Sequence, residues 1–361
     1  MKIYYDYQVF YQQEYGGVSR YHVEIANLIE QYDDTYINIP CFFSHNEYLE
    51  KKFNVEKISI NKFTHNKVIE LLNKFSSMLY LASQDNDIVH PTWVDPYIFL
   101  FKGKAKIVIT IHDMIHELFW QGKAEQEIAR KKNAIYKSDA IIAISNNTKK
   151  DILKLYPDIP EEKIHVVYHG TSHLPKPIKP DSFSVPNKYV LYVGRRDDYK
   201  CGMLVAKAMA HLFKKHDDIS LLYIGGGKLS IEEKRLIQNL EIENKVYQKN
   251  VTDAELAYLY NNALCFVYPS QYEGFGLPIL EAFDNKCPVV CANNSSLPEV
   301  GGDAVLYFDT VEELSTQIEE CITDANLRST LIKKGENRGA LFTWEKCAAE
   351  TYEVYKELVK C

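Results

Sequence analysis

Two glutamates flank a glycine-rich turn in the segment YPSQYEGFGLPILEAF, residues 268–283. The apolar run before this turn predicts a buried strand over Cys265–Tyr268, and the proline after the turn suits the first position of a helix. Glu273 lies in the loop, and Glu281 lies about one turn into the helix. A carboxylate at a strand end can accept hydrogen bonds from the vicinal hydroxyls of a ribose. Glu281 is therefore a candidate ribose ligand, and Glu273 a candidate contact for a sugar held beside it.

The backbone of the same loop is expected to bind an anion. Free N–H groups at a helix N-terminus attract negative charge and need no metal ion to do so. The residues that would supply these groups are Gly274, Phe275, Gly276 and Leu277. The alternative is that both glutamates are solvated side chains around a tight turn, which is the common outcome for an isolated pair. The flanking strand, glycines and proline favour the functional interpretation.

A second segment, LYVGRRDDYK, runs from a predicted strand into a basic loop. Arg195 could bind a pyrophosphate with two parallel hydrogen bonds, and Lys200 could add a point charge. The alternative is an exposed loop whose charge is balanced by Asp197 and Asp198. The later glycines, Gly225–Gly227, fit neither GxGxxG nor the P-loop pattern, so hydride transfer and ATP hydrolysis lose support. We interpret these glycines as one wall of a ligand cleft.

Matching features occur in the N-terminal half. Gly16 and Gly17 fall between the first predicted strand and the first helix, where the backbone can approach a phosphate closely. His112 and Asp113 come just after a strand. His112 could donate a hydrogen bond to a sugar hydroxyl, with Asp113 orienting it or binding an acceptor. A lone histidine at a strand end is more often structural, so this assignment depends on the other motifs.

Metal chemistry has less support in the sequence. The chain contains eight cysteines but no CxxC pair, which disfavours zinc and is typical of a reducing compartment. Asp85 and Asp87 form a D-x-D pair that could hold Mn²⁺ or Mg²⁺ against a diphosphate. This pair precedes a predicted strand, at the end away from the expected ligand edge, so a solvated turn is the favoured interpretation. No metal ligand is assigned.

Strand-like and helix-like segments alternate along the 361 residues, and the length favours two domains at about 150 residues each. Strands are predicted over Lys2–Tyr7, Ile37–Phe42 and Lys106–Ile111, and helices over Ser19–Gln31, Lys67–Leu81 and Cys201–His216, among others. The alternation predicts parallel α/β sheets with helices on both faces. We expect an N-terminal acceptor-binding domain over 1–170, a proline-rich linker over 171–186, a nucleotide-sugar-binding domain over 187–343, and a C-terminal helix over 344–361 that packs towards the N-terminal domain.

Composition limits the partners. A net charge of −7 argues against binding of nucleic acid, because proteins that bind nucleic acid usually carry a basic stripe. No apolar run reaches the roughly 18 residues of a membrane span, and the N-terminus lacks a signal-peptide layout, so a cytoplasmic location is expected. Peripheral membrane contact is a further possibility, although a charged outer helix face is the favoured interpretation. The residues concerned are Lys62, Phe63, Lys67, Val68, Leu71, Leu72, Lys74 and Phe75.

Six motifs occur in a set order: GGVSRY, HDMIHE, SNNTKKD, VGRRDDYK, EGFGLPILEAF and SSLPEVGGDA. With them the chain resembles the retaining nucleotide-sugar enzymes of glycosyltransferase family 4 over almost its whole length. The resemblance implies the GT-B fold, in which two Rossmann-like doubly wound domains face each other across a cleft. It also implies metal-independent transfer of a hexose from a nucleoside diphosphate sugar to a hydroxyl of a glycan or lipid-linked glycan, with retention of anomeric configuration and without a cofactor.

The resemblance also implies roles for particular residues. Glu281 would bind the donor ribose, Glu273 would lie at the donor sugar, and Arg195 with Lys200 would hold the diphosphate. His112 would contact the sugar near the reaction centre. Gly16, Gly17 and Val251 join the loop amides of residues 274–277 as expected donor contacts.

Two points stay open at the level of the sequence. The family often has glycine after the lysine of the diphosphate site, whereas Cys201 stands here, so the local turn is expected to differ. The phrase YVGRRDDYK most resembles members that build bacterial surface polysaccharides, some of which use GDP-mannose, so a GDP-sugar donor is weakly preferred over a UDP-sugar. The alternatives are a sugar-nucleotide-binding protein without activity and a metal-dependent transferase that uses Asp85 and Asp87.

Overall fold

The computed structural model describes residues 1–41, 43–44, 46–49, 67–171 and 173–360. The chain divides into two compact units, each a doubly wound α/β structure. Unit 1 comprises Met1–Gly170 and Thr343–Cys361, and unit 2 comprises Thr171–Phe342. The predicted fold class, an α/β protein with two Rossmann-like doubly wound domains, is confirmed.

Unit 1 is built on a six-stranded sheet with strand order β2-β1-β3-β4-β5-β6, in which every pairing is parallel. The strands are β1 (Lys2–Tyr4), β2 (Tyr36–Asn38), β3 (Ile88–Val89), β4 (Lys106–Ile111), β5 (Ala140–Ala143) and β6 (Ile164–Val166). The helices are α1 (Gln8–Gln12), α2 (Gly17–Ile29), α4 (Lys67–Ser83), α5 (Ile98–Phe101), α6 (Ile115–Phe119), α7 (Glu125–Lys137), α8 (Asn146–Leu155), the short η1 (Glu161–Lys163) and α16 (Trp344–Lys360).

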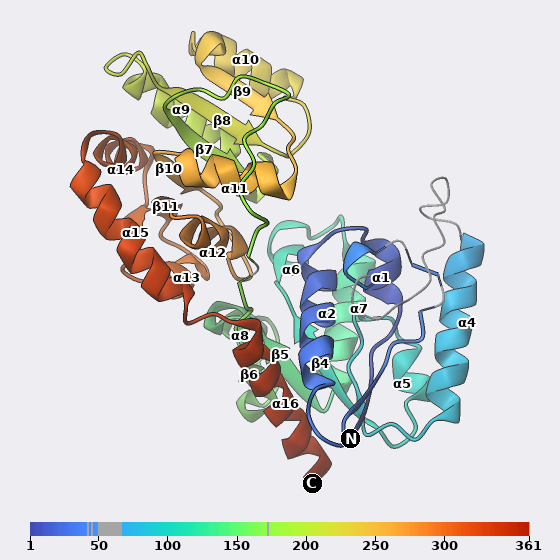
Figure 1. The fold of residues 1–361 in the computed structure, drawn as a ribbon. Helices are drawn as coiled ribbons and strands as arrows, with labels where there is room; N and C mark the ends of the chain where they lie inside the picture. The colour runs from blue at the N-terminus through green and yellow to red at the C-terminus, as the bar shows by residue number, and fades with distance from the viewer. Residues whose placement is uncertain (42, 45, 50–66, 172, 361) are drawn as a thin grey trace. The chain divides into compact units, whose positions relative to one another are not determined.

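Successive side chains of the unit 1 strands enter two separate hydrophobic clusters. Ile107 and Ile109 belong to one cluster, whereas Val108 between them belongs to the other, as the two-residue period of a strand requires. Helices therefore cover both faces of this sheet, which explains why its central strands β4 and β5 are mostly apolar. On one face α16 packs beside α2 (Figure 1), and the Tyr5 and Tyr355 hydroxyls meet at 2.8 Å in the core.

Unit 2 contains a second six-stranded parallel sheet, with order β12-β11-β10-β7-β8-β9. The strands are β7 (Tyr189–Val193), β8 (Ser220–Ile224), β9 (Val246–Lys249), β10 (Cys265–Tyr268), β11 (Val289–Ala292) and β12 (Leu306–Phe308). The helical segments are η2 (Asp198–Lys200), α9 (Gly202–Leu212), α10 (Ile231–Asn239), η3 (Glu243–Lys245), α11 (Asp253–Asn262), α12 (Leu277–Asp284), α13 (Leu297–Gly301), α14 (Val311–Thr323) and α15 (Ala325–Gly339).

The strand order of unit 2 changes direction at its centre. The first strand, β7, pairs with β8 on one side and with β10 on the other. Ligands of doubly wound sheets bind outside the carboxyl ends of the strands at such a switch point. The loops that follow β7 and β10 carry the two main motifs of the sequence, so the topology places these motifs together.

Several element boundaries differ from the sequence-based predictions. The strand predicted over Ile37–Phe42 ends at Asn38; Pro40, two residues on, has no N–H for a ladder, and Phe42 lies outside the described residues. The strand predicted over Lys2–Tyr7 ends at Tyr4, and the short helix α1 follows at Gln8. The short helices α5, α6 and α13 were not predicted, because four or five residues show too little periodicity.

Candidate active site

Lys200 and Glu273 form an ion pair at the switch point of unit 2. The Lys200 Nζ lies 2.6 Å from Glu273 Oε1, and the two side chains are only 24% and 10% exposed. The ammonium group also lies 5.3 Å from the centre of the Tyr199 ring and 5.9 Å from that of Tyr268. The structure thus brings together two residues that the sequence analysis chose separately, one for a diphosphate and one for a sugar.

Arg195 binds a neighbouring carboxylate of its own loop, that of Asp197. Its guanidinium binds Asp197 through Nε–Oδ1 and Nη2–Oδ2 contacts of 3.1 and 2.7 Å, and its side chain is 59% exposed. The hydrogen bond from Arg195 is the main reason that the pKa of Asp197 lies below its ordinary value. A guanidinium carries five N–H donors, and the contacts with Asp197 use two of them.

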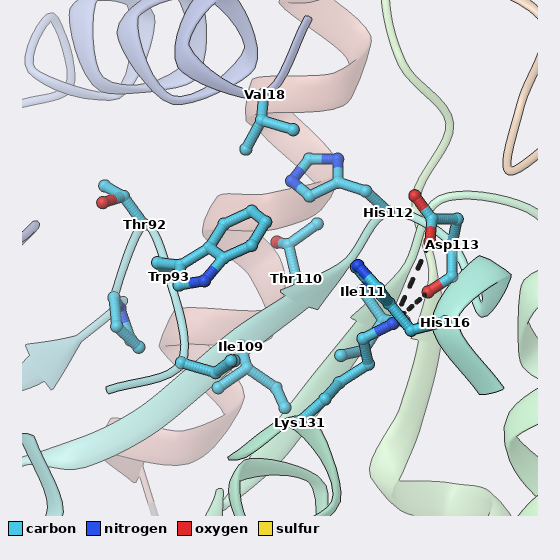
Figure 2. A pocket seen from close by; sticks show the side chains of 12 residues that line it. Val18, Thr92, Trp93, Ile109, Thr110, Ile111, His112, Asp113, His116 and Lys131 are labelled. Carbon is cyan, nitrogen blue, oxygen red and sulfur yellow. Dashed lines mark hydrogen bonds and ion pairs between the residues drawn. The ribbon is translucent and has the colours of Figure 1, made fainter. Parts of the chain in front are cut away.

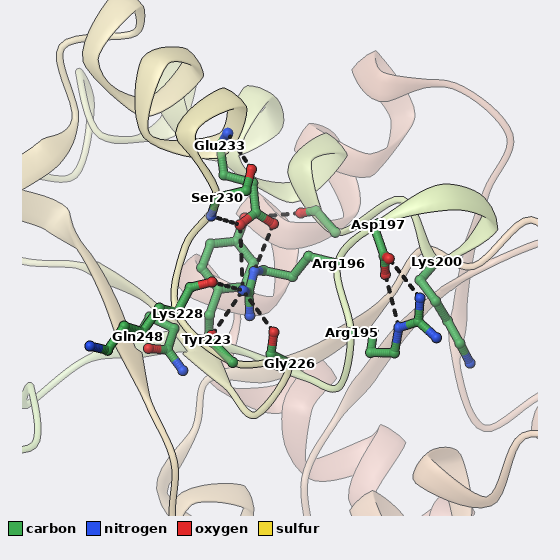
Figure 3. A network of polar contacts seen from close by, with 12 residues as sticks. Arg195, Arg196, Asp197, Lys200, Tyr223, Gly226, Lys228, Ser230, Glu233 and Gln248 are labelled. Atoms are coloured by element: carbon green, nitrogen blue, oxygen red, sulfur yellow. Dashed lines mark hydrogen bonds and ion pairs between the residues drawn. The ribbon is translucent and has the colours of Figure 1, made fainter.

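Arg196, which the sequence analysis did not choose, is the buried arginine of this loop. Its side chain is 2% exposed, and its Nε lies 2.9 Å from Glu233 Oε1. The same guanidinium donates to the backbone carbonyls of Gly225, Gly226, Gly227 and Lys228 at 2.8–3.3 Å (Figure 3). All three glycines have left-handed backbones with φ between 67° and 76°. Arg196 therefore holds the loop that we interpreted from the sequence as a cleft wall.

Glu281 occupies the second turn of α12, as the sequence spacing predicts. The Tyr260 hydroxyl donates to Glu281 Oε2 at 3.4 Å, and burial, followed by the nearby Glu281 carboxylate, raises the pKa of Tyr260 well above its ordinary value. Val251 is half-buried and lies between β9 and Thr252, the N-cap of α11. Both residues belong to unit 2, together with Lys200 and Glu273.

The glycine loop has the backbone that its sequence requires. Gly276 caps α12 with φ +119°, a conformation that L side chains rarely adopt, and a Cβ there would lie 3.2 Å from Leu297. Pro278 is the second residue of α12. Phe275 is 3% exposed, and its ring packs edge-on against Phe342 with centroids 5.7 Å apart. Of the residues expected to offer amides, Gly274, Phe275 and Gly276 thus precede the helix and Leu277 begins it.

Cys201 occupies the position where the family often has glycine, and its backbone is left-handed with φ +51°. It is the N-cap of α9, which therefore starts at Gly202 and ends at Leu212 instead of spanning the predicted Cys201–His216. The turn keeps the geometry that glycine would allow, so the departure in sequence is accommodated as local strain. Left-handed backbone costs an L residue about 1–2 kcal/mol.

Replacing Cys201 by glycine is accordingly expected to raise the free energy of unfolding by about 1 kcal/mol. Chemical denaturation of wild type and Cys201→Gly measures the change. The neighbouring Gly202→Ala is a contrasting variant: its Cβ would lie 2.5 Å from Arg196 Cβ, so it should destabilise. A Cys201→Gly protein no more stable than wild type would show that the left-handed turn carries no strain.

His112 and Asp113 lie in unit 1, at a pocket beyond the carboxyl ends of β3 and β4. The pocket has a volume of about 80 Å³ and is lined by Trp93, Thr110, His116 and Lys131, among others (Figure 2). The buried His112 Nε2 has no hydrogen-bond partner among the described residues. Burial is the main cause that lowers the pKa of His112 to about 4, so the ring is neutral near pH 7. A neutral imidazole can donate to or accept from a hydroxyl group.

Asp113 has local partners that fix its position. Its Oδ1 accepts a hydrogen bond of 3.0 Å from the backbone N–H of Ile115, and Lys131 Nζ donates to the Asp113 carbonyl at 3.0 Å. Lys131 also pairs with Glu117 at 2.9 Å, and these two side chains are 13% and 4% exposed. Trp93, His116 and Lys131 were missed by the sequence analysis, since each is unremarkable until the fold gathers them around one pocket.

Behind His112 lies a buried aromatic cluster. The rings of His22 and His90 have centroids 5.2 Å apart, and His169 stacks on Tyr21 at 4.8 Å and meets His112 at 5.4 Å. His22, His90 and His169 are each at most 3% exposed. Burial is the largest cause of a lowered pKa in all three, and it brings the pKa of His90 to about 3. These histidines are therefore neutral in the folded protein.

Neutral buried histidines predict a stability that decreases in acid. In the unfolded chain a histidine has a pKa of about 6.5. Between that value and the lowered folded pKa, the unfolded state binds protons that the folded state excludes. The free energy of unfolding should thus fall as the pH falls below about 6.5, by up to about 1.4 kcal/mol per pH unit for each such histidine, and the effect should be absent in base.

Denaturation of wild type and His22→Gln at about pH 7.5 and at about pH 5 measures this effect. The variant lacks one titrating ring, so its deficit in stability relative to wild type should shrink by about 2 kcal/mol at the lower pH. Burial raises the pKa of Asp6, which acts in the opposite direction, but Asp6 is common to both proteins and cancels. An equal deficit at both pH values would mean that the His22 ring is not held neutral.

The remaining candidates occupy separate positions in unit 1. Gly17 begins α2, and a Cβ on Gly16 would lie 2.1 Å from the Gln13 amide oxygen, so a larger residue here would displace the end of the Gln13 side chain. Asp87 Oδ2 accepts a hydrogen bond of 2.7 Å from the Lys2 backbone at the amino end of β3. In the described part of the chain, no group of three or more His, Cys, Asp or Glu side chains is placed to hold a metal ion.

Helix α4 exposes an apolar stripe, with Val68, Leu71, Leu72 and Phe75 each at least 50% exposed. Lys74, which we considered for a basic border, pairs instead with Asp95 at 2.9 Å. Lys62 and Phe63 lie outside the described residues. None of the described helices is both long enough and apolar enough to cross a bilayer.

The fold and the arrangement of these loops define a two-unit α/β protein of the GT-B type. Residues 15–173 match the family described as Glycosyltransferase Family 4, and residues 176–338 match the family described as Glycosyl transferases group 1. Together the two matches cover most of the chain. The protein belongs to the glycosyltransferases of group 1 and family 4, which confirms the resemblance seen in the sequence.

Individual relatives agree with this assignment. O-antigen chain mannosyltransferase B of Escherichia coli is 46% identical over 114 residues, which are 31% of this chain and 30% of that protein. The chain spans less than two thirds of the length of several such relatives, 60% in one and 34% in another.

Solved structures resemble the whole chain. A glycosyltransferase from Rickettsia africae has a TM-score of 0.71 at 20% identity and covers 99% of this chain and 98% of its own. HepE of Anabaena, solved with UDP and glucose, has a TM-score of 0.72 at 17% identity, with 98% and 99% coverage. At these identities the likeness concerns the fold.

Proposed function

We propose that this protein is a glycosyltransferase that moves a hexose from a nucleoside diphosphate sugar to a hydroxyl of a glycan or lipid-linked glycan. The observation that carries the proposal is the Lys200–Glu273 pair at the switch point of unit 2, with the N-terminus of α12 beside it. A cation, a carboxylate and the N-terminus of a helix are the groups that a diphosphate and a sugar need. The family membership and the name of the mannosyltransferase relative support a hexosyl donor.

In this proposal each group in unit 2 has one part of the donor to bind. Lys200 and Arg195 bind the diphosphate, together with the amides of residues 274–277. Glu281 binds the ribose hydroxyls beside Tyr260, and Val251 contacts the nucleotide. Glu273 accepts hydrogen bonds from the sugar. The backbone of Gly16 and Gly17 in unit 1 is a further proposed donor contact.

The proposed chemistry breaks the bond between the anomeric carbon and the diphosphate oxygen, and forms a bond from that carbon to the acceptor oxygen. The acceptor proton passes to the departing diphosphate, so attack occurs on the face that the leaving group vacates and the anomeric configuration is kept. Negative charge grows on the diphosphate as the bond breaks, and Lys200 and the loop amides are aimed at it. We propose that these groups replace the divalent ion that other transferases use.

The acceptor is proposed to enter the unit 1 pocket. Trp93 offers an apolar ring with an N–H at its edge, which suits a sugar with one apolar face and a rim of hydroxyls. The unpaired His112 Nε2 would then hydrogen-bond a sugar hydroxyl, with Asp113 nearby. Contact of the α4 stripe with a membrane stays a prediction, which co-sedimentation with anionic vesicles at low salt would test.

Thermal shifts with GDP-mannose, UDP-glucose and other donors, with and without EDTA, test the proposal. A donor at about 100 times its dissociation constant should stabilise the protein by about 2.7 kcal/mol. We expect one sugar nucleotide to stand out, with a slight preference for GDP-mannose, and its shift to survive EDTA. NMR of the product should show the anomeric configuration of the donor. Binding without transfer to any glycan acceptor would favour a non-catalytic protein, and loss of the shift in EDTA would favour a metal-dependent enzyme.

A further inference from the structure

Two consecutive serines bind the backbone of the loop that carries Glu273. Ser295 and Ser296 follow β11 and precede α13, in the SSLPEVGGDA motif that the proposed function leaves without a role. Ser295 Oγ accepts a hydrogen bond of 2.8 Å from the Glu273 N–H and donates to the Glu273 carbonyl at 2.9 Å. Ser296 Oγ lies 2.9 Å from the Glu273 carbonyl and 2.7 Å from that of Phe275, which share its one proton.

Asn294, the residue before the two serines, binds the backbone at the start of the same loop. With its amide turned so that the nitrogen faces the loop, Asn294 donates to the carbonyls of Ser270 and Gln271, both at 3.1 Å. Three successive side chains therefore bind the backbone on both sides of the glutamate. We call Asn294, Ser295 and Ser296 the loop clamp.

The clamp is a buried and strained arrangement. Ser296 is 0% exposed, and Ser295 has a left-handed backbone with φ +50°, an uncommon conformation for a serine. An ordinary surface turn satisfies its backbone groups internally or with water and needs no such partner. Because both the N–H and the carbonyl of Glu273 are bound, the direction in which its side chain leaves the backbone is fixed, and the carboxylate meets Lys200 from that position.

We propose that Asn294, Ser295 and Ser296 are positioning residues that hold Glu273 in register with Lys200 and with the donor sugar. The inference rests on the proposed function, in which Glu273 contacts the sugar. The hydrogen bonds of the clamp go to the backbone of residues 270–275 and to no side chain proposed to bind the nucleotide, so its loss is expected to affect the sugar-dependent step more than nucleotide binding. A misplacement of about 1 Å at such a contact can lower a rate by about a hundredfold.

Two variants test the clamp. Ser295→Gly suits the left-handed backbone and removes the hydroxymethyl group, and Ser296→Ala removes the other hydroxyl. Each is expected to lower kcat by about ten- to a hundredfold at saturating donor, with a clearly smaller increase in the dissociation constant of the sugar-free nucleoside diphosphate. The peptide that covers residues 270–277 should exchange its amide hydrogens faster in both variants. Ser295→Asn, which tolerates the backbone and keeps a polar side chain, should recover part of the rate.

The matched control is Ser315→Ala, which removes a hydroxyl that donates to the Ala208 carbonyl at 3.4 Å elsewhere in unit 2. It should leave kcat and the exchange of the loop unchanged. Wild-type kcat in Ser295→Gly and in Ser296→Ala, or equal weakening of nucleotide binding and turnover, would overturn the positioning role while the proposed function stood. If the wild type transferred no sugar at all, the proposed function would fail, and unchanged amide exchange in the variants would separately overturn the clamp.

Discussion

Replacement of Lys200 by methionine is expected to lower the turnover of the nucleoside diphosphate sugar by about 10²–10³-fold. Lys200 lies 2.6 Å from Glu273 at the switch point. No other side-chain cation of the described unit 2 loops forms an ion pair with this carboxylate. Without it, the charge that develops on the leaving diphosphate would be met by the α12 amides and the exposed Arg195 only. Steady-state kinetics per folded protein, with folding checked by thermal denaturation, measures the loss.

Lys188→Met is the matched control for this experiment. Lys188 pairs with Asp218 at the same 2.6 Å, but both side chains are more than half exposed and lie away from the switch point. Its replacement should change turnover by less than about twofold, because exposed ion pairs contribute little. Turnover of Lys200→Met within a factor of three of wild type would remove the lysine from the proposed leaving-group site.

Replacement of Arg196 by methionine is expected to lower the free energy of unfolding by about 3–5 kcal/mol. The change removes the arginine from the Glu233 carboxylate, which is 12% exposed and keeps a hydrogen bond from the Ser230 backbone N–H. It also removes one donor from each of four backbone carbonyls of the Gly225–Lys228 loop. Three successive left-handed glycines have little other reason to stay in one conformation. Equilibrium denaturation of the isolated variant measures the loss.

Arg195→Met separates stability from turnover at the adjacent position. Its exposed pair with Asp197 is expected to contribute less than about 1 kcal/mol to stability. In the proposed function Arg195 binds the diphosphate, so turnover should fall while the denaturation midpoint stays close to that of wild type. If the two substitutions lowered the free energy of unfolding equally, Arg196 could not be the arginine that stabilises the loop and Arg195 the exposed one that binds ligand.

The fold was predictable from the sequence because its signals are local. The predicted bounds of β4 and β10 match the structure, since each is a mostly apolar run of strand length. Glu273 and Lys200 could also be brought together in advance, since a strand order that reverses places the two following loops side by side. The direct contact between the two charged groups could not be predicted, because it depends on the conformations of the two loops that carry them.

The division of work between Arg195 and Arg196 illustrates what the sequence leaves open. Two adjacent residues after a strand point in opposite directions, and only the structure shows which one enters the core. The loop clamp was missed for a related reason: Asn294, Ser295 and Ser296 act on backbone atoms of a segment about twenty residues earlier. Trp93 and the buried histidines come together only when the unit 1 sheet is assembled. Their spacing along the chain follows no pattern that predicts a shared site.

Helix α16 belongs to unit 1 although it follows unit 2 in the sequence. The two units can therefore finish folding only in a certain order during synthesis. Unit 2 is one continuous segment, so it can close as soon as Phe342 has left the ribosome. Unit 1 must wait longer, although most of it is translated before unit 2, since Tyr355 of α16 is fully buried against Tyr5. A nascent chain would therefore present a finished unit 2 while unit 1 still exposed the apolar face on which α16 packs.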